Sequence, residues 1–227
     1  AWSCGRGLGP RELRFPLVVP LNDFSSMTIP STLFLGVTGA SGAIYARRVL
    51  ELALAAGLDV DCCYSPSARR VLKEECGLDL LDDPTVLLPK GFKFRGALRL
   101  WAHDDIGAPP ASGTALGEVA LVLPCSLTTL AGVASGRAGN LIERASQVAL
   151  KEGRNLILVP RETPLSRLHL DEMSRLAWAG AVILPACPGF YQRPLSIADL
   201  VDQLAGKILA AAGIPQGVLP AWSGGQA

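Results

Sequence analysis

Four charged residues in the second half of the chain have the types and spacing to bind an anionic ligand. Arg144 and Lys151 are seven residues apart in a segment with helical spacing, so both side chains point from one helix face. Arg161 and Glu162 directly follow residues 156–159, an apolar run typical of a strand. Open α/β sheets bind their ligands beyond the carboxyl ends of the strands. We therefore predict that three cations and a carboxylate converge at this edge around a phosphorylated ligand. The alternative is a solvated helix face and a loop ion pair.

Two strand-to-helix turns are predicted to face the same edge. The first carries Gly39, Ser41 and Gly42, whose spacing does not match the G-x-G-x-x-G dinucleotide fingerprint. The second carries the hydroxyls of residues 126–129, and Ser65 follows another strand pattern. Amides at a helix N-terminus bind phosphate, and two such turns suit one mononucleotide better than an extended dinucleotide. The alternative is that these hydroxyls only cap their helices.

The elements that must position these residues alternate along the chain. We predict strands at 32–37, 59–64, 97–101, 118–123, 156–159 and 181–184, and helices at 44–56, 67–75, 141–152, 166–179 and 196–212, with a further helix starting near 124–130. Ser196 and Asp199 resemble a capping box. This alternation predicts a single-domain α/β fold, a Rossmann-like doubly wound parallel sheet in a three-layer sandwich. At 227 residues, one such domain accounts for the length. We place residues 1–29 in an N-terminal extension outside the core.

Composition excludes several classes of protein. The 21 basic and 20 acidic residues give a formal net charge of +1, which argues against a nucleic-acid partner. No apolar run reaches the roughly eighteen residues that span a bilayer. Six cysteines without a C-x-x-C pair, together with only two histidines, predict reduced thiols, no metal site and a cytoplasmic location.

Ordered motifs along the chain resemble those of the UbiX-type flavin prenyltransferases, members of the wider flavin-binding cysteine-decarboxylase-like superfamily. The resemblance covers about residues 32–222. The motifs are Gly-Val-Thr-Gly-Ala-Ser-Gly-Ala (36–43), Ala-Pro-Pro-Ala-Ser-Gly (108–113), Pro-Cys-Ser-Leu-Thr-Thr-Leu (124–130), Asn-Leu-Ile-Glu-Arg-Ala (140–145), Ala-Leu-Lys-Glu (149–152), Pro-Arg-Glu-Thr-Pro-Leu (160–165) and Pro-Gly-Phe-Tyr (188–191). Their number and order make the resemblance specific, which a single glycine-rich turn would not.

This resemblance implies a transferase that modifies a flavin. Such enzymes transfer a dimethylallyl group from dimethylallyl monophosphate to N5 and C6 of reduced FMN without a metal. The product, prenylated FMN, would serve a UbiD-type decarboxylase. Residues 30–227 would then form the FMN-binding flavin prenyltransferase domain, and the family's large closed assemblies imply a homo-oligomer such as a dodecamer.

The resemblance also implies a role for individual residues. The flavin would be contacted by Gly39, Ala40, Ser41, Ser65, Ser126, Leu127, Thr128, Thr129 and Arg161. The prenyl phosphate would be bound by Arg144, Lys151, Arg161, Tyr191 and Lys207, with Trp222 closing the site. Catalytic roles would fall to Ser41, Glu75, Lys151 and Glu162, with Glu75 supplied by a neighbouring subunit. Two positions depart from the family pattern: Ile106, where an aromatic residue is frequent, and Lys207, where Arg is frequent. We expect Lys207 to weaken prenyl phosphate binding, because Lys cannot form the bidentate contact of Arg.

Three alternative functions fit these residues less well. An FMN-dependent oxidative decarboxylase of a cysteinyl substrate would need a catalytic histidine, and neither His103 nor His169 falls in a matching motif. A non-catalytic flavin carrier would need fewer cations. A nicotinamide dehydrogenase is disfavoured by the glycine spacing and because Asp59 and Asp61 start a strand, whereas a ribose-binding acid stands at a strand's end.

Overall fold

The computed structural model describes residues 30–219, so the predicted extension at residues 1–29 and the predicted site residue Trp222 lie outside the described residues. The strands are β1 (Thr32–Val37), β2 (Asp59–Tyr64), β3 (Leu98–Trp101), β4 (Val119–Cys125), β5 (Asn155–Pro160) and β6 (Val182–Ile183). The helices are α1 (Ala43–Ala55), α2 (Pro66–Cys76), α3 (Leu127–Ala134), α4 (Leu141–Lys151), α5 (Arg167–Trp178) and α6 (Ile197–Ala211), with short 3₁₀ helices η2 (Pro84–Leu87) and η3 (Pro109–Ala111). The predicted elements are confirmed, with ends shifted by one or two residues.

The six strands of the described region form one parallel sheet in the order β3-β2-β1-β4-β5-β6. The chain moves outward from β1 to β3 in one direction and then returns to add β4, β5 and β6 on the other side of β1. The order therefore reverses between β1 and β4, which is where doubly wound sheets open a crevice for a ligand. The prediction of a doubly wound parallel sheet is confirmed.

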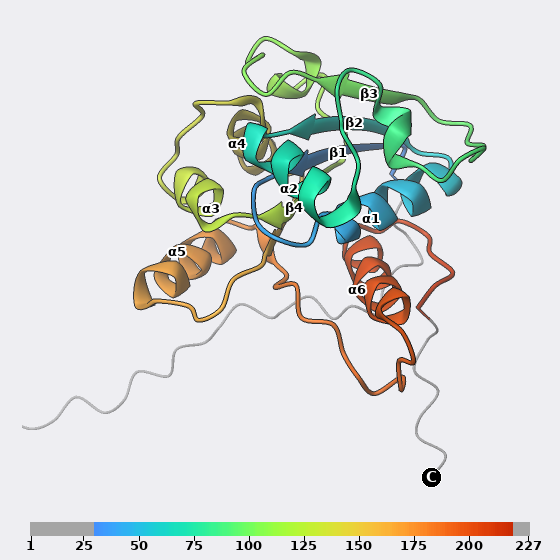
Figure 1. Cartoon of the computed structure of the whole chain (residues 1–227). Helices are drawn as coiled ribbons and strands as arrows, with labels where there is room; N and C mark the ends of the chain where they lie inside the picture. Colours follow the sequence, from blue (N-terminus) through green and yellow to red (C-terminus); the bar gives the residue numbers. More distant parts are fainter. Residues whose placement is uncertain (1–29, 220–227) are drawn as a thin grey trace, which may run out of the picture.

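Helices cover both faces of the sheet, as Figure 1 shows, and each face has its own apolar core. Helices α1, α2 and α6 pack on one face, whereas α3, α4 and α5 pack on the other. Alternate residues of β1 serve the two cores, since Leu33 and Leu35 face the first group and Phe34 faces the second. Gly36 lets β1 approach α4 closely, because a Cβ atom there would lie 2.9 Å from Ile142. This is the expected three-layer sandwich.

Polar side chains set where several helices begin. Ser65 caps α2, Ser126 caps α3 and Ser196 caps α6, each by accepting a hydrogen bond from an amide of the first turn. The capping box predicted for Ser196 and Asp199 is confirmed. Such caps satisfy amides that have no partner within the helix, and each typically contributes about 1 kcal/mol.

Candidate functional site

The carboxyl edge of the sheet gathers turns that are far apart in the sequence. Residues 39–42 follow β1, Ser65 follows β2, residues 126–129 follow β4 and Arg161 follows β5. Main-chain bonds tie these strand ends together: the Ser65 amide donates to Val37 at 3.0 Å, and the Ala186 amide donates to Pro160 at 2.9 Å. The predicted flavin-contacting residues therefore lie along one edge of a single chain.

The turn after β1 is held by a cation and a carboxylate. Arg161 Nε donates to the Ser41 carbonyl at 3.0 Å. The Glu75 carboxylate accepts hydrogen bonds from the amides of Gly42 and Ala43, both at 2.9 Å. Partial burial raises the pKa of Glu75, but the hydrogen bonds from Ser41, Gly42 and Ala43 and the charge of Arg161 outweigh it, so this pKa lies below its ordinary value. Glu75 is consequently ionised at neutral pH.

This geometry corrects one expectation about the first turn. The N-terminus of α1 has no amide open to a phosphate at Gly42 and Ala43, because Glu75 already supplies the negative charge that this helix end favours. Glu75 here contacts the turn of its own chain, and the expected contribution of Glu75 to the pocket of a neighbouring subunit stays a prediction. Three residues separated by up to 120 positions, Ser41, Glu75 and Arg161, thus form one cluster.

The turn after β4 is different, because within the described residues no carboxylate accepts a hydrogen bond from the amides of Leu127 and Thr128. Ser126 Oγ accepts from the Thr129 amide at 3.3 Å and contacts the Thr129 hydroxyl at 3.1 Å. Leu127 and Thr128 open α3, where amides have no acceptor within the helix. Next to them the thiol of Cys125 is fully buried, and burial raises its pKa to about 12, which makes it an inert core residue rather than a nucleophile. The start of α3 is therefore the better phosphate site of the two predicted turns.

A cavity of about 520 Å³ adjoins this second turn. It lies between α3 and α5 and is lined by Leu127, Thr128, Ala131, Gly132, Ser135, Arg137, Leu168, His169 and Glu172. His169 Nδ1 accepts from the Ser166 amide at 3.2 Å and so completes the cap of α5. The cavity has the size of ordinary ligand pockets.

The predicted convergence of Arg144, Lys151 and Arg161 within one chain is wrong. Helix α4 runs opposite to the strands: its first amide, on Leu141, donates to His103 beyond β3, and the Asn155 amide that follows the helix donates to Glu118 before β4. Lys151, at the end of α4, therefore lies at the amino edge of the sheet and pairs with its neighbour Glu152.

Lys207 also lies away from the carboxyl edge, because its helix runs opposite to the strands. Helix α6 also runs back along the sheet, and its last residue, Ala211, accepts a hydrogen bond from the Asn155 side chain at 3.0 Å. Lys207 is one turn before that end and is exposed. Arg144 is nearer the start of α4, where its Nε donates to the Ala111 carbonyl at 3.2 Å. Seven residues of helix rise about 10 Å, enough to take Lys151 well away from Arg144.

Two further predicted residues do stay at the carboxyl edge. Glu162 follows Arg161 and is exposed, with its carboxylate accepting from the Thr163 amide at 3.0 Å. Tyr191 is in the segment between β6 and α6 and is 53% exposed. The chain thus places Ser41, Glu75 and Glu162 on one edge and Lys151 on the other.

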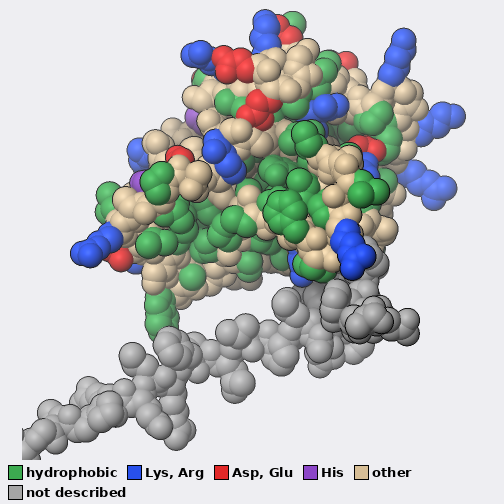
Figure 2. Space-filling view, turned by 60° about the horizontal axis from the view of Figure 1, so that its bottom comes forward, with side chains coloured by type: hydrophobic (Ala, Val, Ile, Leu, Met, Phe, Trp, Pro, Cys, Tyr) green, Lys and Arg blue, Asp and Glu red, His purple; other side chains and the backbone are tan. Residues whose placement is uncertain are grey.

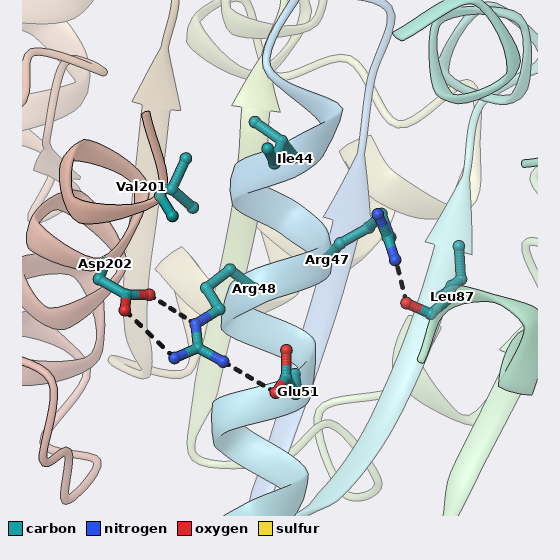
Figure 3. A pocket seen from close by; sticks show the side chains of 8 residues that line it. Ile44, Arg47, Arg48, Glu51, Leu87, Val201 and Asp202 are labelled. Carbon is teal, nitrogen blue, oxygen red and sulfur yellow. Dashed lines mark hydrogen bonds and ion pairs between the residues drawn. The ribbon is translucent and has the colours of Figure 1, made fainter. Parts of the chain in front are cut away.

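Helix α1 is anchored by a second group of charges, shown in Figure 3. Arg48 bridges Glu51 at 2.8 Å and Asp202 of α6 at 2.6 Å, and Arg47 Nε donates to the Leu87 carbonyl at 3.2 Å. The cavity of about 320 Å³ between α1 and α6 includes none of the predicted site residues. These contacts instead fix α1, and with it the turn that precedes it.

The sequence prediction missed one polar residue in the middle of the site. Thr38 is 2% exposed, and its hydroxyl donates to Pro124 at 2.7 Å and accepts from the Ser126 amide at 2.6 Å. A threonine directly after an apolar strand and before Gly39 was the available signal. Its two partners lie more than 80 residues away, which no local pattern reveals.

The sequence of this chain is similar to those of known flavoproteins. Its sequence matches the Flavoprotein family over residues 24–211. It is 44% identical over 200 residues to the flavin prenyltransferase UbiX of Pseudomonas aeruginosa, covering 86% of this chain and 96% of the relative. Identity to the flavin prenyltransferase UbiX of Methanothermobacter thermautotrophicus is 36% over 203 residues, covering 87% and 98%.

Solved structures agree with the sequence relatives. The crystal structure of AnUbiX (PadA1) in complex with FMN and dimethylallyl pyrophosphate matches with a TM-score of 0.77 at 34% identity, covering 86% of this chain and 98% of the other. A dodecameric FMN-dependent UbiX-like decarboxylase from Escherichia coli O157:H7 matches with a TM-score of 0.74 at 32% identity, covering 85% and 99%. Fold, site motifs and relatives agree over nearly the whole described region, and the chain belongs to the Flavoprotein family and, within it, to the UbiX flavin prenyltransferases.

Proposed function

We propose that this protein transfers a dimethylallyl group from dimethylallyl monophosphate to N5 and C6 of reduced FMN, making prenylated FMN. The observation that carries the proposal is the single carboxyl edge at which Ser41, Glu75 and Arg161 contact one another beside the open start of α3. The names of the relatives and the FMN and prenyl pyrophosphate held by AnUbiX support the same chemistry.

The residues at the start of α3 fit the phosphate of FMN. The amides of Leu127 and Thr128 lack acceptors within the helix, and the side chains of Ser126, Thr128 and Thr129 add hydroxyls. The Gly39 to Ser41 turn and Ser65 would complete the flavin site, and Arg161 contributes the positive charge closest to the Ser41 turn. Bound reduced FMN would supply the nucleophilic N5 and C6 atoms.

Charged side chains would then act on the prenyl donor. Breaking the carbon–oxygen bond leaves negative charge on the phosphate, and fixed cations stabilise that charge where it develops. Those cations would be supplied by Arg144, Lys151, Arg161 and Lys207. They would replace the Mg²⁺ ion that stabilises phosphate in other enzymes, and the Tyr191 hydroxyl would donate a further hydrogen bond. Glu162 and Ser41 would move protons at N5 and C6, and ionised Glu75 would orient Ser41.

We infer from the positions of Lys151 and Lys207 that each site takes residues from a second copy of the chain. Both lie toward the amino edge of the sheet, so they would reach a prenyl phosphate bound at the carboxyl edge from a neighbouring protomer. Figure 2 shows hydrophobic side chains gathered on the face turned forward. Large apolar side chains are exposed in two segments: Leu165, Leu168, Leu170 and Trp178 in and before α5, and Phe190, Tyr191, Leu195 and Ile197 before and in α6. We infer a homo-oligomer, as in the dodecameric relative.

Two finer inferences accompany the proposal. None of the helices within residues 30–219 could span a membrane. The free thiols of the described chain support the proposal that the enzyme is cytoplasmic. A UbiD-type decarboxylase would receive the prenylated flavin. Within the described chain no group of three or more His, Cys, Asp or Glu side chains could hold a metal ion, and we propose a metal-independent reaction on the strength of the cations above.

An anaerobic incubation tests the proposal. The purified protein is mixed with reduced FMN and either dimethylallyl monophosphate or the diphosphate, and the flavin is analysed by mass spectrometry. We expect the mass gain of one prenyl unit, greater with the monophosphate and lost in Glu162→Gln. Asp171→Asn, an exposed carboxylate of α5 that does not line the cavity beside the start of α3, is the matched control. Bound but unmodified FMN with both donors would contradict the proposal and favour a flavin carrier.

A further inference from the structure

Thr38 joins the two turns of the site through one buried hydroxyl. Its Oγ1 donates to the Pro124 carbonyl at 2.7 Å, and its amide donates to the same carbonyl at 3.2 Å. The same Oγ1 accepts from the Ser126 amide at 2.6 Å. Thr38 directly precedes Gly39 of the first turn, and Ser126 is the N-cap of α3 in the second. The hydroxyl therefore contacts the main chain on both sides of Cys125, the last residue of β4.

The local backbone explains why a side chain is needed at this point. The ladder between β1 and β4 ends at the pair Gly36 and Val122, although both strands continue further. Pro124 has no amide hydrogen, so β4 cannot extend the ladder through that residue. Beyond the ladder the Thr38 amide still donates to the Pro124 carbonyl, and the Thr38 hydroxyl adds one hydrogen bond in each direction. It does so where the strand order reverses, beneath the crevice that such sheets offer to ligands.

We propose that Thr38 is a positioning residue that holds the Gly39 turn and the start of α3 together as one flavin-binding cradle. The inference rests on the proposed function, because it assumes that FMN contacts both turns. Loss of the hydroxyl leaves the partly buried Ser126 amide without its acceptor, and an amide that loses its acceptor makes the turn shift or admit water. A displaced Ser126 changes the direction of the first-turn amides of α3, on which the phosphate would rest.

A purely structural role for Thr38 makes a different prediction. A buried hydroxyl that only stabilises the fold would lower the melting temperature when removed but leave the FMN affinity of the folded protein unchanged. Ser146 offers a matched comparison, because it is also fully buried and donates to the Ile142 carbonyl at 2.8 Å within α4. Ser146 has no contact with either turn in the described structure.

The experiment measures FMN affinity and thermal unfolding of the full-length protein for the wild type and three variants. Thr38→Val keeps the side-chain shape and removes the hydroxyl, Thr38→Ser keeps the hydroxyl, and Ser146→Ala is the control. By fluorescence titration with reduced and oxidised FMN, we expect Thr38→Val to weaken binding about tenfold, the equivalent of one buried hydrogen bond left unmade. Thr38→Ser should stay within about twofold of wild type, and Ser146→Ala should lose thermal stability but keep its FMN affinity.

Hydrogen exchange of the protein without flavin gives a second readout. The peptide that contains Ser126 should exchange faster in Thr38→Val than in wild type, and it should be protected again in Thr38→Ser. If Thr38→Val does not fold, Thr38→Cys, which keeps a weaker hydrogen-bonding atom, should show an intermediate loss of FMN affinity. Wild-type affinity in a folded variant without the hydroxyl, or an equal loss in Ser146→Ala, would overturn the inference. Failure of the wild type itself to bind FMN would instead overturn the proposed function.

Discussion

The two edges of the sheet differ in how completely one chain builds them. At the carboxyl edge, Ser41, Glu75 and Arg161 are held by contacts within the chain, and Thr38 ties the neighbouring turns together. Toward the amino edge, the ion pair of Lys151 within the described residues is with the adjacent Glu152, and Lys207 is exposed. This difference is the basis of our proposal that one chain prepares the flavin site, whereas the prenyl phosphate site takes residues from a second chain.

The largest expected effect comes from separating these two edges in mixed oligomers. Arg161→Met alters the carboxyl edge and Lys151→Met alters the amino edge, and we expect each alone to lower prenyl transfer at least about a hundredfold, because each removes a charge that stabilises the transition state. Co-expressed chains that carry one substitution each should recover part of the activity, since some sites then receive both wild-type residues.

Anaerobic mass spectrometry of the flavin measures this recovery. Lys90→Met, an exposed lysine without an assigned role, should remain active and serves as the control. Mixed oligomers no more active than either parent would show that both residues act from the same chain, contrary to the geometry described above.

A second prediction concerns the charge that stabilises the carboxyl edge. Glu75→Gln should lower the free energy of unfolding by about 1 kcal/mol at pH 7, the usual contribution of a charged group at a helix N-terminus. The pKa of Glu75 in the folded protein lies below its ordinary value of 4.5. Its stabilising contribution is therefore present above pH 4.5 and is lost as the pH falls through the lower folded value.

Denaturant unfolding of wild type and variant between pH 7 and pH 3 measures the difference. We expect the two curves to approach one another below pH 4.5. Glu74→Gln is the matched control, because Glu74 is exposed and only pairs with Arg70 one turn away at 2.8 Å. A constant difference between wild type and Glu75→Gln across the whole range would contradict the assignment.

Lys207→Arg sharpens the comparison at the amino edge. Arg binds phosphate through two parallel hydrogen bonds, whereas Lys acts as a point charge. We expect the KM for dimethylallyl monophosphate to fall about threefold while the Kd for FMN stays the same, because only the donor site changes. Steady-state kinetics at saturating flavin measure this KM. An unchanged or raised KM in Lys207→Arg would contradict the prediction that Lys207 weakens prenyl phosphate binding.

The smallest effect is expected in the core beneath the carboxyl edge. Tyr64 is 1% exposed, and within the described residues its hydroxyl has no hydrogen-bond partner. Burial is the main cause that raises the pKa of Tyr64, and the nearby Cys62 thiol raises it further. The hydroxyl therefore stays neutral. Tyr64→Phe should leave FMN binding unchanged and stabilise the protein by about 0.5 kcal/mol, because it removes an unsatisfied polar group. A loss of stability in urea unfolding would contradict this prediction.

Much of the fold was predictable from the sequence because its signals are local. The period of apolar residues distinguished strands from helices, and Ser196 with Asp199 marked the start of α6. The alternation of these elements was enough to predict a doubly wound parallel sheet. The candidate flavin-contacting residues could be placed at one edge, since parallel strands all end on the same side.

Only the tertiary structure decided which charges meet. The helical period correctly put Arg144 and Lys151 on one face of α4, but a period says nothing about which end of a helix reaches the carboxyl edge. Glu75 contacts Gly42 across 33 positions and Thr38 contacts Ser126 across 88, and both contacts depend on how separate elements pack. Local propensities act over a few residues, whereas the position of a side chain between strands and helices is set by the packing of the whole sheet.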